Sequence, residues 1–582
     1  MHVGRLGDSA LDFHCCSGMI RRGSGAMASA EADKRGKRGR RRRVVAVILL
    51  ALIAALALAW SRYWYYLPGI LAALRDPVEA NHPVEWQQGP AEAPEGPRPP
   101  NIVFILVDDL GFNDLSYHGG GVVPTPNIDA IAREGVIFSR GYAGNATCAP
   151  SRAAVMTGRY ATRFGFEFTP APKAFERLVG HYRQGSRMPI YHEEREDALP
   201  PLAEQRVPEG EIMLPELLGP RGYHTVFLGK WHLGDTPGTR PEDRGFDEAL
   251  GFMPGASRYA RSDDPAIVES YQDFDPIDKF LWANLPFAIQ HNGGRRFEPS
   301  GYLTDYLAEQ AVAAIEANRN RPFFLYLAFN AVHTPLQALR ADYDALPEIE
   351  DHRLRVYAAM IRAPDRDVGA VMDALERHGL ADDTLVIFTS DNGGANYLGL
   401  PDINKPYRGW KATFFEGGVH VPFFARWPGH IPAGATYPYP VGHVDIYATA
   451  AAAAGVEVPR DRVIDGVDLL PFLGGLETAR PHQTLYWRSG PYKALLDGDW
   501  KLQISANPPK AWLFDLKADP TESTDLAESN PAVVESLKAS LDAIDGQQSE
   551  PSWPSLFEAP VAIDHPLSYP DDPSDVVIYW AN

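Results

Sequence analysis

The hydrophobic positions of this chain fall into short continuous runs, and each run ends abruptly in polar residues. Continuous apolar runs of this length are typical of strands that are buried on both faces of a sheet. The runs are Asn101–Val107, His224–Leu228, Pro322–Phe329 and Thr384–Thr389. Between them, Thr304–Asn318 and Tyr357–Leu375 have the spacing of helices. The alternation predicts an α/β fold in which a mostly parallel sheet lies between two layers of helices.

The pattern changes after residue 455, where the strand-like segments become shorter. They are Thr484–Arg488, Tyr492–Leu496 and Trp500–Ile504, and a helical pattern follows at Pro531–Ile544. We therefore expect a main domain over residues 98–455 and a smaller α+β subdomain over residues 456–548. Residues 549–582 are rich in Pro and Asp, which predicts an irregular tail.

One apolar run near the N-terminus is much longer than the others. Val44–Trp60 contains 17 consecutive apolar residues, which follow Arg40–Arg43 and precede the aromatic residues 63–66. With the aromatic residues, the run reaches the roughly 20 residues that cross a bilayer. Arginines stay on the cytoplasmic side and aromatic side chains favour the interface. These features predict a transmembrane signal anchor at residues 44–66.

This topology places a basic segment, residues 1–43, in the cytoplasm and the body of the protein in the periplasm or outside the cell. The alternative is a cleaved signal peptide and a secreted body, because Ala57-Leu58-Ala59 resembles a cleavage site. Residues 67–97 are rich in Pro, Glu and Ala from Asp76 onward, which predicts an extended linker.

The charge distribution limits the class of partner. The first 62 residues contain 12 of the 55 Lys and Arg but only 4 of the 75 Asp and Glu, so the remainder has 43 basic against 71 acidic residues. A nucleic-acid partner would require a basic face. The acidic body therefore argues against nucleic-acid binding, whereas the basic N-terminal segment fits a membrane anchor.

Two pairs of polar residues directly follow predicted strands. Asp108-Asp109 follow the first run and Asp391-Asn392 follow the last. Such pairs are also common in the turns that end strands. In a parallel sheet, however, ligands bind at the carboxyl edge of the strands, and these oxygen atoms suit Ca²⁺ or Mg²⁺. The sequence therefore predicts a divalent-cation site at this edge.

The segment Cys148-Ala149-Pro150-Ser151-Arg152 continues to Thr157-Gly158-Arg159. Pro150 favours the first turn of a helix and Gly158 favours its end, so we expect Cys148 at a helix N-terminus. That end of a helix attracts anions, and Arg152 adds a positive charge. The alternative, a cysteine that only fills space in the core, does not account for this context.

Together these segments resemble the type I sulfatases, a family with an alkaline-phosphatase-like fold whose signature is Cys-x-Pro-Ser-Arg followed by Thr-Gly-Arg. The resemblance extends in the same order to Gly229–Gly234, Val332–Pro335 and Lys411–Gly418, and spans about residues 98 to 515. It implies that a formylglycine-generating enzyme oxidises Cys148 to formylglycine, whose hydrate attacks sulfate esters. It also implies a Ca²⁺ site, with Mg²⁺ as the alternative, whose ligands are Asp108, Asp109, Cys148, Asp391 and Asn392.

The reaction that the resemblance implies assigns a role to each remaining site residue. Lys230 and Lys411 would stabilise charge on the sulfuryl oxygens, and Arg152 would orient residue 148. His232 would act as the base that expels sulfate, and His333 would protonate the leaving alcohol, because imidazole titrates near neutrality. The sequence does not determine which of the two histidines is the base and which is the proton donor.

Two other functions compete with hydrolysis of sulfate esters. Related enzymes of the same fold hydrolyse phosphodiesters or phosphonates, and a membrane-tethered binding protein could retain the fold without catalysis. The blocks around Lys230 and Lys411 favour sulfate, and no site residue is missing. We therefore expect an arylsulfatase-like enzyme whose substrate is an aryl or carbohydrate sulfate ester.

The entrance to the site is expected in residues 166–210 and 252–300. Aromatic side chains suit stacking on sugar rings or aryl groups. The candidates in the second segment are Tyr259, Phe274, Phe280, Trp282 and Phe287.

Overall fold

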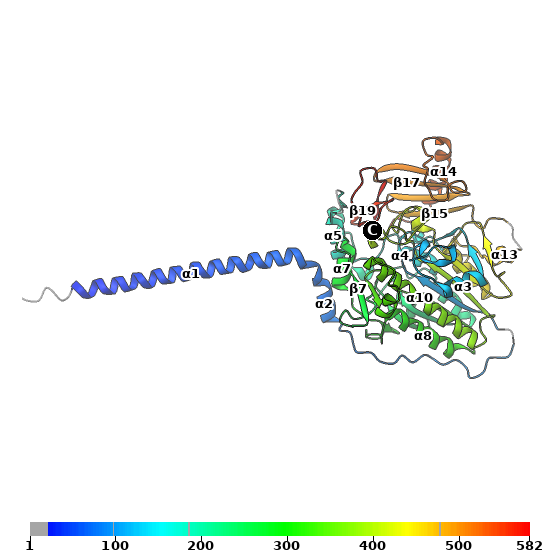
Figure 1. The fold of residues 1–582 in the computed structure, drawn as a ribbon, viewed down its shortest axis with the longest axis horizontal. Helices are drawn as coiled ribbons and strands as arrows, with labels where there is room; N and C mark the ends of the chain where they lie inside the picture. Colours follow the sequence, from blue (N-terminus) through cyan, green and yellow to red (C-terminus); the bar gives the residue numbers. More distant parts are fainter. Residues whose placement is uncertain (1–20, 97, 184–186, 476–478) are drawn as a thin grey trace, which may run out of the picture. The chain divides into compact units, whose positions relative to one another are not determined.

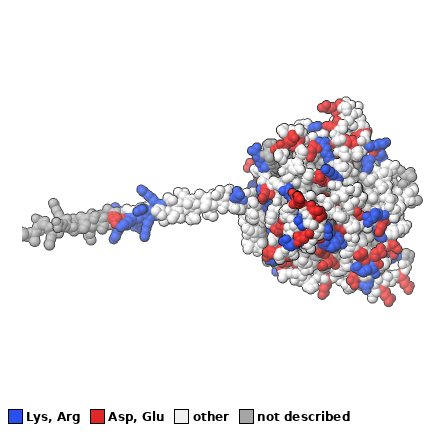
Figure 2. Space-filling model, in the orientation of Figure 1, with Lys and Arg blue, Asp and Glu red and all other residues white. Residues whose placement is uncertain are grey.

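The computed structural model describes residues 21–96, 98–183, 187–475 and 479–582, which belong to two compact units, Met1–Leu67 and Pro68–Asn582. In the first unit, α1 (Arg21–Tyr63) is followed by a 3-10 turn at Trp64–Tyr66. This helix contains a window with mean hydropathy 2.8, and its length and composition suffice to cross a membrane. Figure 2 shows basic side chains gathered just before its uncharged stretch. The first 20 residues of the predicted cytoplasmic segment lie outside the described residues.

The second unit is built on a nine-stranded sheet with the order β13-β2-β12-β11-β1-β9-β5-β6-β8 (Figure 1). The five strands β11-β1-β9-β5-β6 are parallel, whereas β12 and β8 pair antiparallel with their neighbours. The strand bounds are β1 Asn101–Val107, β2 Val136–Phe138, β5 His224–Lys230, β6 Glu248–Phe252, β8 Gln290–His291, β9 Phe323–Ala328, β11 Thr384–Ser390, β12 Phe423–Arg426 and β13 Ala435–Tyr437. The predicted mostly parallel sheet is confirmed.

Strand β1 shows why the apolar runs are continuous. Alternate side chains of a strand point to opposite faces, and every residue of β1 is buried. Val103 and its alternate neighbours join a core formed with α3, α8 and α10, whereas Phe104 and its neighbours join a second core formed with α4, α6 and α12. The sheet is therefore covered by helices on both faces.

The helices and short sheets complete the second unit. The helices are α2 Leu67–Arg75, α3 Pro126–Glu134, α4 Cys148–Thr157, α5 Lys173–His181, α6 Leu214–Leu218, α7 Pro276–Asn284, α8 Leu303–Asn318, α9 Arg340–Asp344, α10 His352–Arg377, α11 Glu416–Val419, α12 Val444–Ala453, α13 Leu470–Leu473 and α14 Pro531–Asp545. Two short pairs join β7 (Ile267–Ser270) with β10 (Leu336–Leu339) and β3 (Gly141–Tyr142) with β14 (Val441–Gly442).

The C-terminal part contains an antiparallel sheet of β15 (Thr484–Ser489), β16 (Tyr492–Asp497), β17 (Trp500–Ala506) and β18 (Pro509–Asp515). Leu537 and Leu541 of α14 pack on its face. The predicted α+β character of this region is confirmed, while the boundaries at 455 and 548 stay predictions.

The prediction of an irregular tail is wrong. Within residues 549–582, β19 (Phe557–Ala562) pairs with β20 (Val577–Ala581) and with β4 (Ile190–Tyr191). These strands contain Pro and acidic residues, which interrupt the apolar pattern that would identify a strand in the sequence. They exist because a distant partner segment completes their hydrogen bonds.

The predicted linker also differs from a free spacer. Its first residues form α2, and the following extended segment packs on the body. Trp86 is buried and its indole N–H donates to Gln310 at 3.0 Å, while the Gly89 N–H donates to the carbonyl of Ala317. Hydrogen bonds over this length fix the segment along the surface.

Candidate active site

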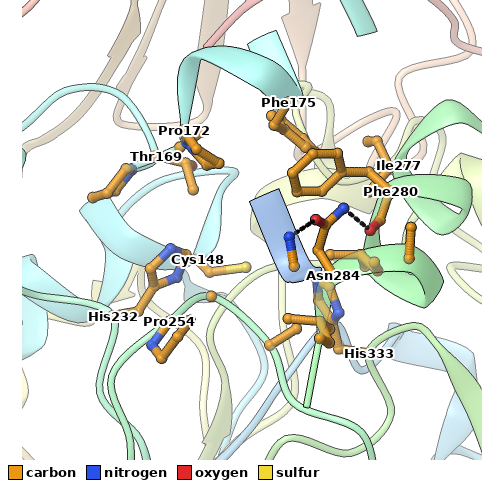
Figure 3. Close-up of a pocket in the computed structure, with 18 of the residues that line it drawn as sticks. Cys148, Thr169, Pro172, Phe175, His232, Pro254, Ile277, Phe280, Asn284 and His333 are labelled. Atoms are coloured by element: carbon orange, nitrogen blue, oxygen red, sulfur yellow. Dashed lines mark hydrogen bonds between the residues drawn. The ribbon is translucent and has the colours of Figure 1, made fainter. Parts of the chain in front are cut away.

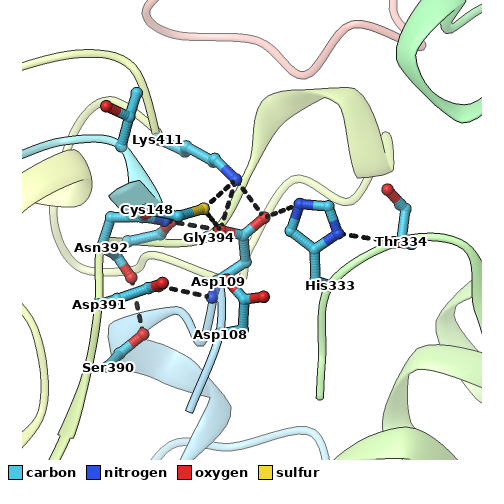
Figure 4. Close-up of polar contacts among 12 residues, drawn as sticks. Asp108, Asp109, Cys148, His333, Thr334, Ser390, Asp391, Asn392, Gly394 and Lys411 are labelled. Carbon is cyan, nitrogen blue, oxygen red and sulfur yellow. Dashed lines mark hydrogen bonds and ion pairs between the residues drawn. The ribbon is translucent and has the colours of Figure 1, made fainter. Parts of the chain in front are cut away.

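The carboxyl ends of β1 and β11 bring the two polar pairs together. The strands are parallel neighbours, and Val107 lies opposite Ser390, so Asp108-Asp109 and Asp391-Asn392 emerge side by side (Figure 4). Ligand atoms of Asp108, Asp109, Cys148 and Asp391 all lie within 4.8 Å of one another, and all four residues are buried. The strand pairing thus creates the site that the strand ends predicted.

The oxygen atoms of this cluster fit a divalent cation. Asp108 Oδ1 and Asn392 Oδ1 are buried and have no hydrogen-bond partner in the described parts of the chain. A buried polar atom without a partner costs about 1–3 kcal/mol. Carboxylate and amide oxygens are the ligands that hard cations prefer, so a bound ion would satisfy both atoms.

Each carboxylate is also paired with a basic side chain. Lys230 Nζ lies 2.5 Å from Asp108, and Lys411 Nζ lies 2.7 and 2.8 Å from the two oxygens of Asp109. Arg152 pairs with Asp391 through Nε and Nη2 at 2.9 and 2.8 Å. The sequence predicted the two lysines as partners of the sulfuryl group and Arg152 as a support for residue 148, and it did not predict this pairing with the acids.

The electrostatics of the acids differ from one position to the next. Burial alone would raise the pKa of Asp109, but the charge of Lys411 outweighs it and holds that pKa below its usual range. At Asp108, burial and the neighbouring charge of Asp391 raise the pKa despite Lys230. Asp109 is therefore the most firmly ionised of this pair.

Cys148 is the first residue of α4, and its side chain is 3% exposed. Its Sγ lies 3.1 Å from Lys411 Nζ and 3.8 Å from Asp109 Oδ1. Burial raises the pKa of the thiol even though Lys230 and Lys411 oppose this effect. The unmodified side chain is thus a protonated thiol and a poor nucleophile. The hydrogen bonds of Arg152 go to Asp391 and the Lys230 carbonyl, so it supports residue 148 through these neighbours.

The two candidate histidines are placed differently. His333 Nδ1 lies 2.6 Å from the Thr334 carbonyl, which leaves Nε2 to face Asp109 at 3.7 Å. Burial lowers the pKa of His333 to about 3. The His232 ring lines the cavity near Cys148 (Figure 3), and neither of its nitrogens has a hydrogen-bond partner among the described residues. Burial lowers the pKa of His232 as well.

The backbone is unusual at this site. Asp109, His232 and Ala412 have φ values of 59°, 64° and 71°. Non-glycine residues adopt this left-handed region at an energetic cost, and such residues concentrate where function requires a particular orientation. The surrounding packing therefore holds these residues in orientations that the sequence pattern could not reveal.

A cavity of about 1170 Å³ opens above Cys148, His232, His333 and Lys411. Phe280 and Phe287 line it, as predicted. Tyr259 does not: it is buried and donates to the carbonyls of Asn330 and His333.

Trp282 and Phe274 were also predicted to lie at the entrance, but neither lines the cavity. Trp282 stacks on Tyr271, and Phe274 lies under Arg353.

Sequence reasoning missed several contributors to the site. Tyr397 lines the cavity, and its hydroxyl donates to Asp109 at 3.0 Å. Its only signal was its position five residues after Asn392. Residues of α2, with Trp580 and Asn582 of the C-terminal segment, also line the cavity. Neither segment contains a recognisable motif, so the sequence predicts an extended linker and an irregular tail there.

Comparison with known proteins identifies the family. The model of the family described as Sulfatase matches residues 100–456. The chain is 35% identical over 421 residues to N-acetylgalactosamine-6-sulfatase of Canis lupus familiaris, with 70% of this chain and 72% of that protein covered. It is 33% identical over 457 residues to steryl-sulfatase of Mus musculus, with 68% of each chain covered.

Solved structures of similar proteins support the same family and fold. The crystal structure of Ps i-CgsB in complex with k-i-k-neocarrahexaose has a TM-score of 0.65 and 33% identity, covering 78% of this chain and 95% of that one. The phosphonate monoester hydrolase of Agrobacterium radiobacter has a TM-score of 0.54 at 20% identity, which shows the shared fold alone. The predicted fold, family and reaction class are confirmed: this chain belongs to the sulfatase family and is a hydrolase of sulfate esters.

Proposed function

We propose that Cys148 is converted to formylglycine by a separate generating enzyme and then provides the nucleophile for sulfate-ester hydrolysis. Once formed, the hydrated aldehyde supplies a hydroxyl that takes the sulfuryl group from the alcohol. The observation that carries the proposal is the placement of Cys148 Sγ beside Lys411 Nζ and the buried acids. The raised pKa of the thiol supports it, because the unmodified residue would be a weak nucleophile.

Asp108, Asp109, Asp391 and Asn392 would hold Ca²⁺, and residue 148 would complete the ligand set. Asp108 Oδ1 and Asn392 Oδ1 have no hydrogen-bond partner among the described residues, which supports this assignment. The bound cation would supply Lewis-acid stabilisation of charge on the sulfuryl oxygens. The all-oxygen acidic set suits Ca²⁺ and Mg²⁺ alike, and elemental analysis of the purified protein distinguishes them.

Among the basic side chains, Lys411 binds and orients the sulfate, whereas the others fix the acids. Lys411 reaches into the cavity and carries its charge next to residue 148. Lys230 and Arg152 hold Asp108 and Asp391 in place. Fixed charges stabilise a developing negative charge without reorganising at the moment of reaction.

The histidines handle the protons. His333 presents Nε2 to the cavity because Nδ1 is occupied by the Thr334 carbonyl. Asp109 and an anionic ester would favour protonation at Nε2, which fits the donor to the leaving alcohol. His232 has both ring nitrogens unpartnered in the described chain, which fits the base that later releases sulfate.

We also propose that residues 44–66 anchor the protein in a membrane, with the body on the periplasmic or extracellular side. The apolar α1 window and the preceding arginines support this topology. A cleaved and secreted form is the alternative, and sequencing of the mature N-terminus distinguishes the two.

The function is tested with purified protein whose residue 148 has been examined by mass spectrometry. We expect the peptide containing residue 148 to have lost its thiol, and Cys148→Ala to abolish release of nitrophenol from 4-nitrophenyl sulfate. An aryl phosphonate monoester serves as the competing substrate. Faster turnover of the phosphonate, or full activity with an unmodified thiol, would contradict the proposal.

A further inference from the structure

Helix α2 (Leu67–Arg75) has two faces with different neighbours. Leu67, Ile70, Leu71 and Leu74 are 40%, 54%, 39% and 76% exposed, and their spacing places them on one stripe of the helix. Pro68, Gly69, Ala72 and Ala73 lie on the other side and line the catalytic cavity, and Ile70, at the edge of the stripe, lines it as well. A single short helix therefore separates the cavity from an exposed apolar surface.

This helix is fixed to the body of the enzyme. The Gly69 N–H donates to Asn284 Oδ1 at 2.7 Å, and Figure 3 shows Asn284 among the residues that line the cavity. A Cβ at Gly69 would lie 2.8 Å from the Ala283 carbonyl oxygen, so the two helices approach closely there. Just beyond the helix, Asp76 forms an ion pair with Arg296 at 2.6 Å. These contacts attach α2 to α7 and to Arg296, so that α2 forms one wall of the cavity.

The walls that α5 and α7 form beside α2 are also apolar, although the lining as a whole includes charged side chains such as Arg261 and Glu298. Phe175 and Val179 of α5 and Ile277, Phe280 and Leu281 of α7 line it together with α2. The sugar hydroxyls of an oligosaccharide buried against these side chains would lose hydrogen bonds to water without replacement. A large apolar alcohol would instead gain from burial, at roughly 25 cal/mol per Å².

Chain length keeps the exposed stripe of α2 close to the anchor. Only Trp64-Tyr65-Tyr66 separate the end of α1 from the start of α2. Three residues span at most about 11 Å even when extended. If residues 44–66 cross a bilayer, the stripe begins at its surface, where apolar side chains on one face of a helix are stabilised by the lipid.

We propose that α2 lies on the outer surface of the membrane and that the site acts on sulfate esters of membrane lipids or other amphiphiles with a large apolar alcohol. The sulfate reaches Cys148 and Lys411 at the base of the cavity, while the apolar part lies against α2, α5 and α7. The proposal rests on the sulfatase activity of the site and on the proposed anchor. It replaces the expectation of an extended linker over residues 67–97.

The test compares three sulfate esters with the full chain in phosphatidylcholine vesicles. Cholesteryl sulfate in the vesicles represents the amphiphile, a 6-O-sulfated disaccharide represents a carbohydrate, and 4-nitrophenyl sulfate reports the basal reaction. We expect kcat/KM to be highest for cholesteryl sulfate. The double variant Leu71→Asp/Leu74→Asp removes apolar surface outside the cavity, and should lower turnover of cholesteryl sulfate about tenfold while leaving 4-nitrophenyl sulfate unchanged.

Val463→Asp is the matched control, because Val463 is 53% exposed and does not line the cavity. It should alter neither rate. Should the double variant unfold, Leu71→Ser/Leu74→Ser removes the apolar stripe without adding charge. Preference for the disaccharide, or full vesicle activity in the stripe variants, would overturn the lipid proposal while leaving the sulfatase intact. Failure to release sulfate from any of the three esters would instead overturn the proposed reaction.

Discussion

Lys411 is the side chain whose removal tests the electrostatics of the site most directly. Its Nζ contacts both oxygens of Asp109 and lies 3.1 Å from Cys148 Sγ, and its side chain is only 10% exposed. Lys411→Ala therefore removes a fixed positive charge at the point where negative charge develops. Loss of one such preorganised group typically lowers kcat by about 10²–10³, so we expect a loss of that size.

The effect on stability should be smaller than for a typical buried ion pair. Removing one partner of a buried pair costs about 3–5 kcal/mol when the other charge is left without compensation. Asp109, however, also accepts hydrogen bonds from Asn392 Nδ2 at 2.8 Å and from the Tyr397 hydroxyl at 3.0 Å. We therefore expect a destabilisation of about 1–3 kcal/mol and a folded variant.

The assay measures kcat and KM with 4-nitrophenyl sulfate, the thermal unfolding midpoint, and the modification at residue 148 by mass spectrometry. Lys405→Ala is the control, because Lys405 forms an exposed pair with Asp402 on the surface and such pairs contribute little. A Lys411→Ala enzyme with modified residue 148 and wild-type kcat would refute the electrostatic role.

Three further predictions concern the metal, the N-terminal segment and pH. Asp391→Ala should lose its divalent cation by elemental analysis and lower turnover more than about a hundredfold; retention of the ion with full activity would contradict the ligand assignment. A protein that begins at Arg98 lacks buried Trp86 and should be less stable than one that begins at Pro68 by at least about 3 kcal/mol, as compared by denaturant unfolding; equal midpoints would show that the segment contributes nothing. Burial raises the pKa of Glu176 to about 8 against an ordinary 4.5. Between these two values the folded state retains a proton that the unfolded state releases. The free energy of unfolding should therefore fall by up to about 1.4 kcal/mol per unit as the pH rises across this interval. Glu176→Gln should flatten that fall when unfolding midpoints are compared at pH 5 and pH 8; an unchanged profile would exclude Glu176 as its source.

Much of the fold was predictable because it depends on local pattern. The apolar run Asn101–Val107 coincides with β1, and Thr384–Thr389 differs from β11 by one residue. A strand buried on both faces must be apolar throughout, so its limits are visible in the sequence. Pro531–Ile544 was likewise predicted within one residue of α14, because its helical spacing is local.

Local pattern does not predict segments whose structure depends on distant partners. Residues 557–562 form a strand only because residues 577–581 and 190–191 pair with them. The α2 segment is short and was grouped with the Pro-rich residues that follow it. Neither has enough apolar periodicity of its own to distinguish it from a loop.

The sequence by itself determined the family, through the Cys148 signature, and the chemical identity of the site, through acids placed directly after buried strands. Only the tertiary structure decided which charges meet. Lys230 and Asp108 are 122 positions apart, and Lys411 and Asp109 are 302 apart. Only the tertiary structure made α2 a wall of the cavity. Strand limits and helix caps are set by neighbours in the chain, whereas ion pairs and cavity walls are set by strand register and by the packing of helices on the sheet.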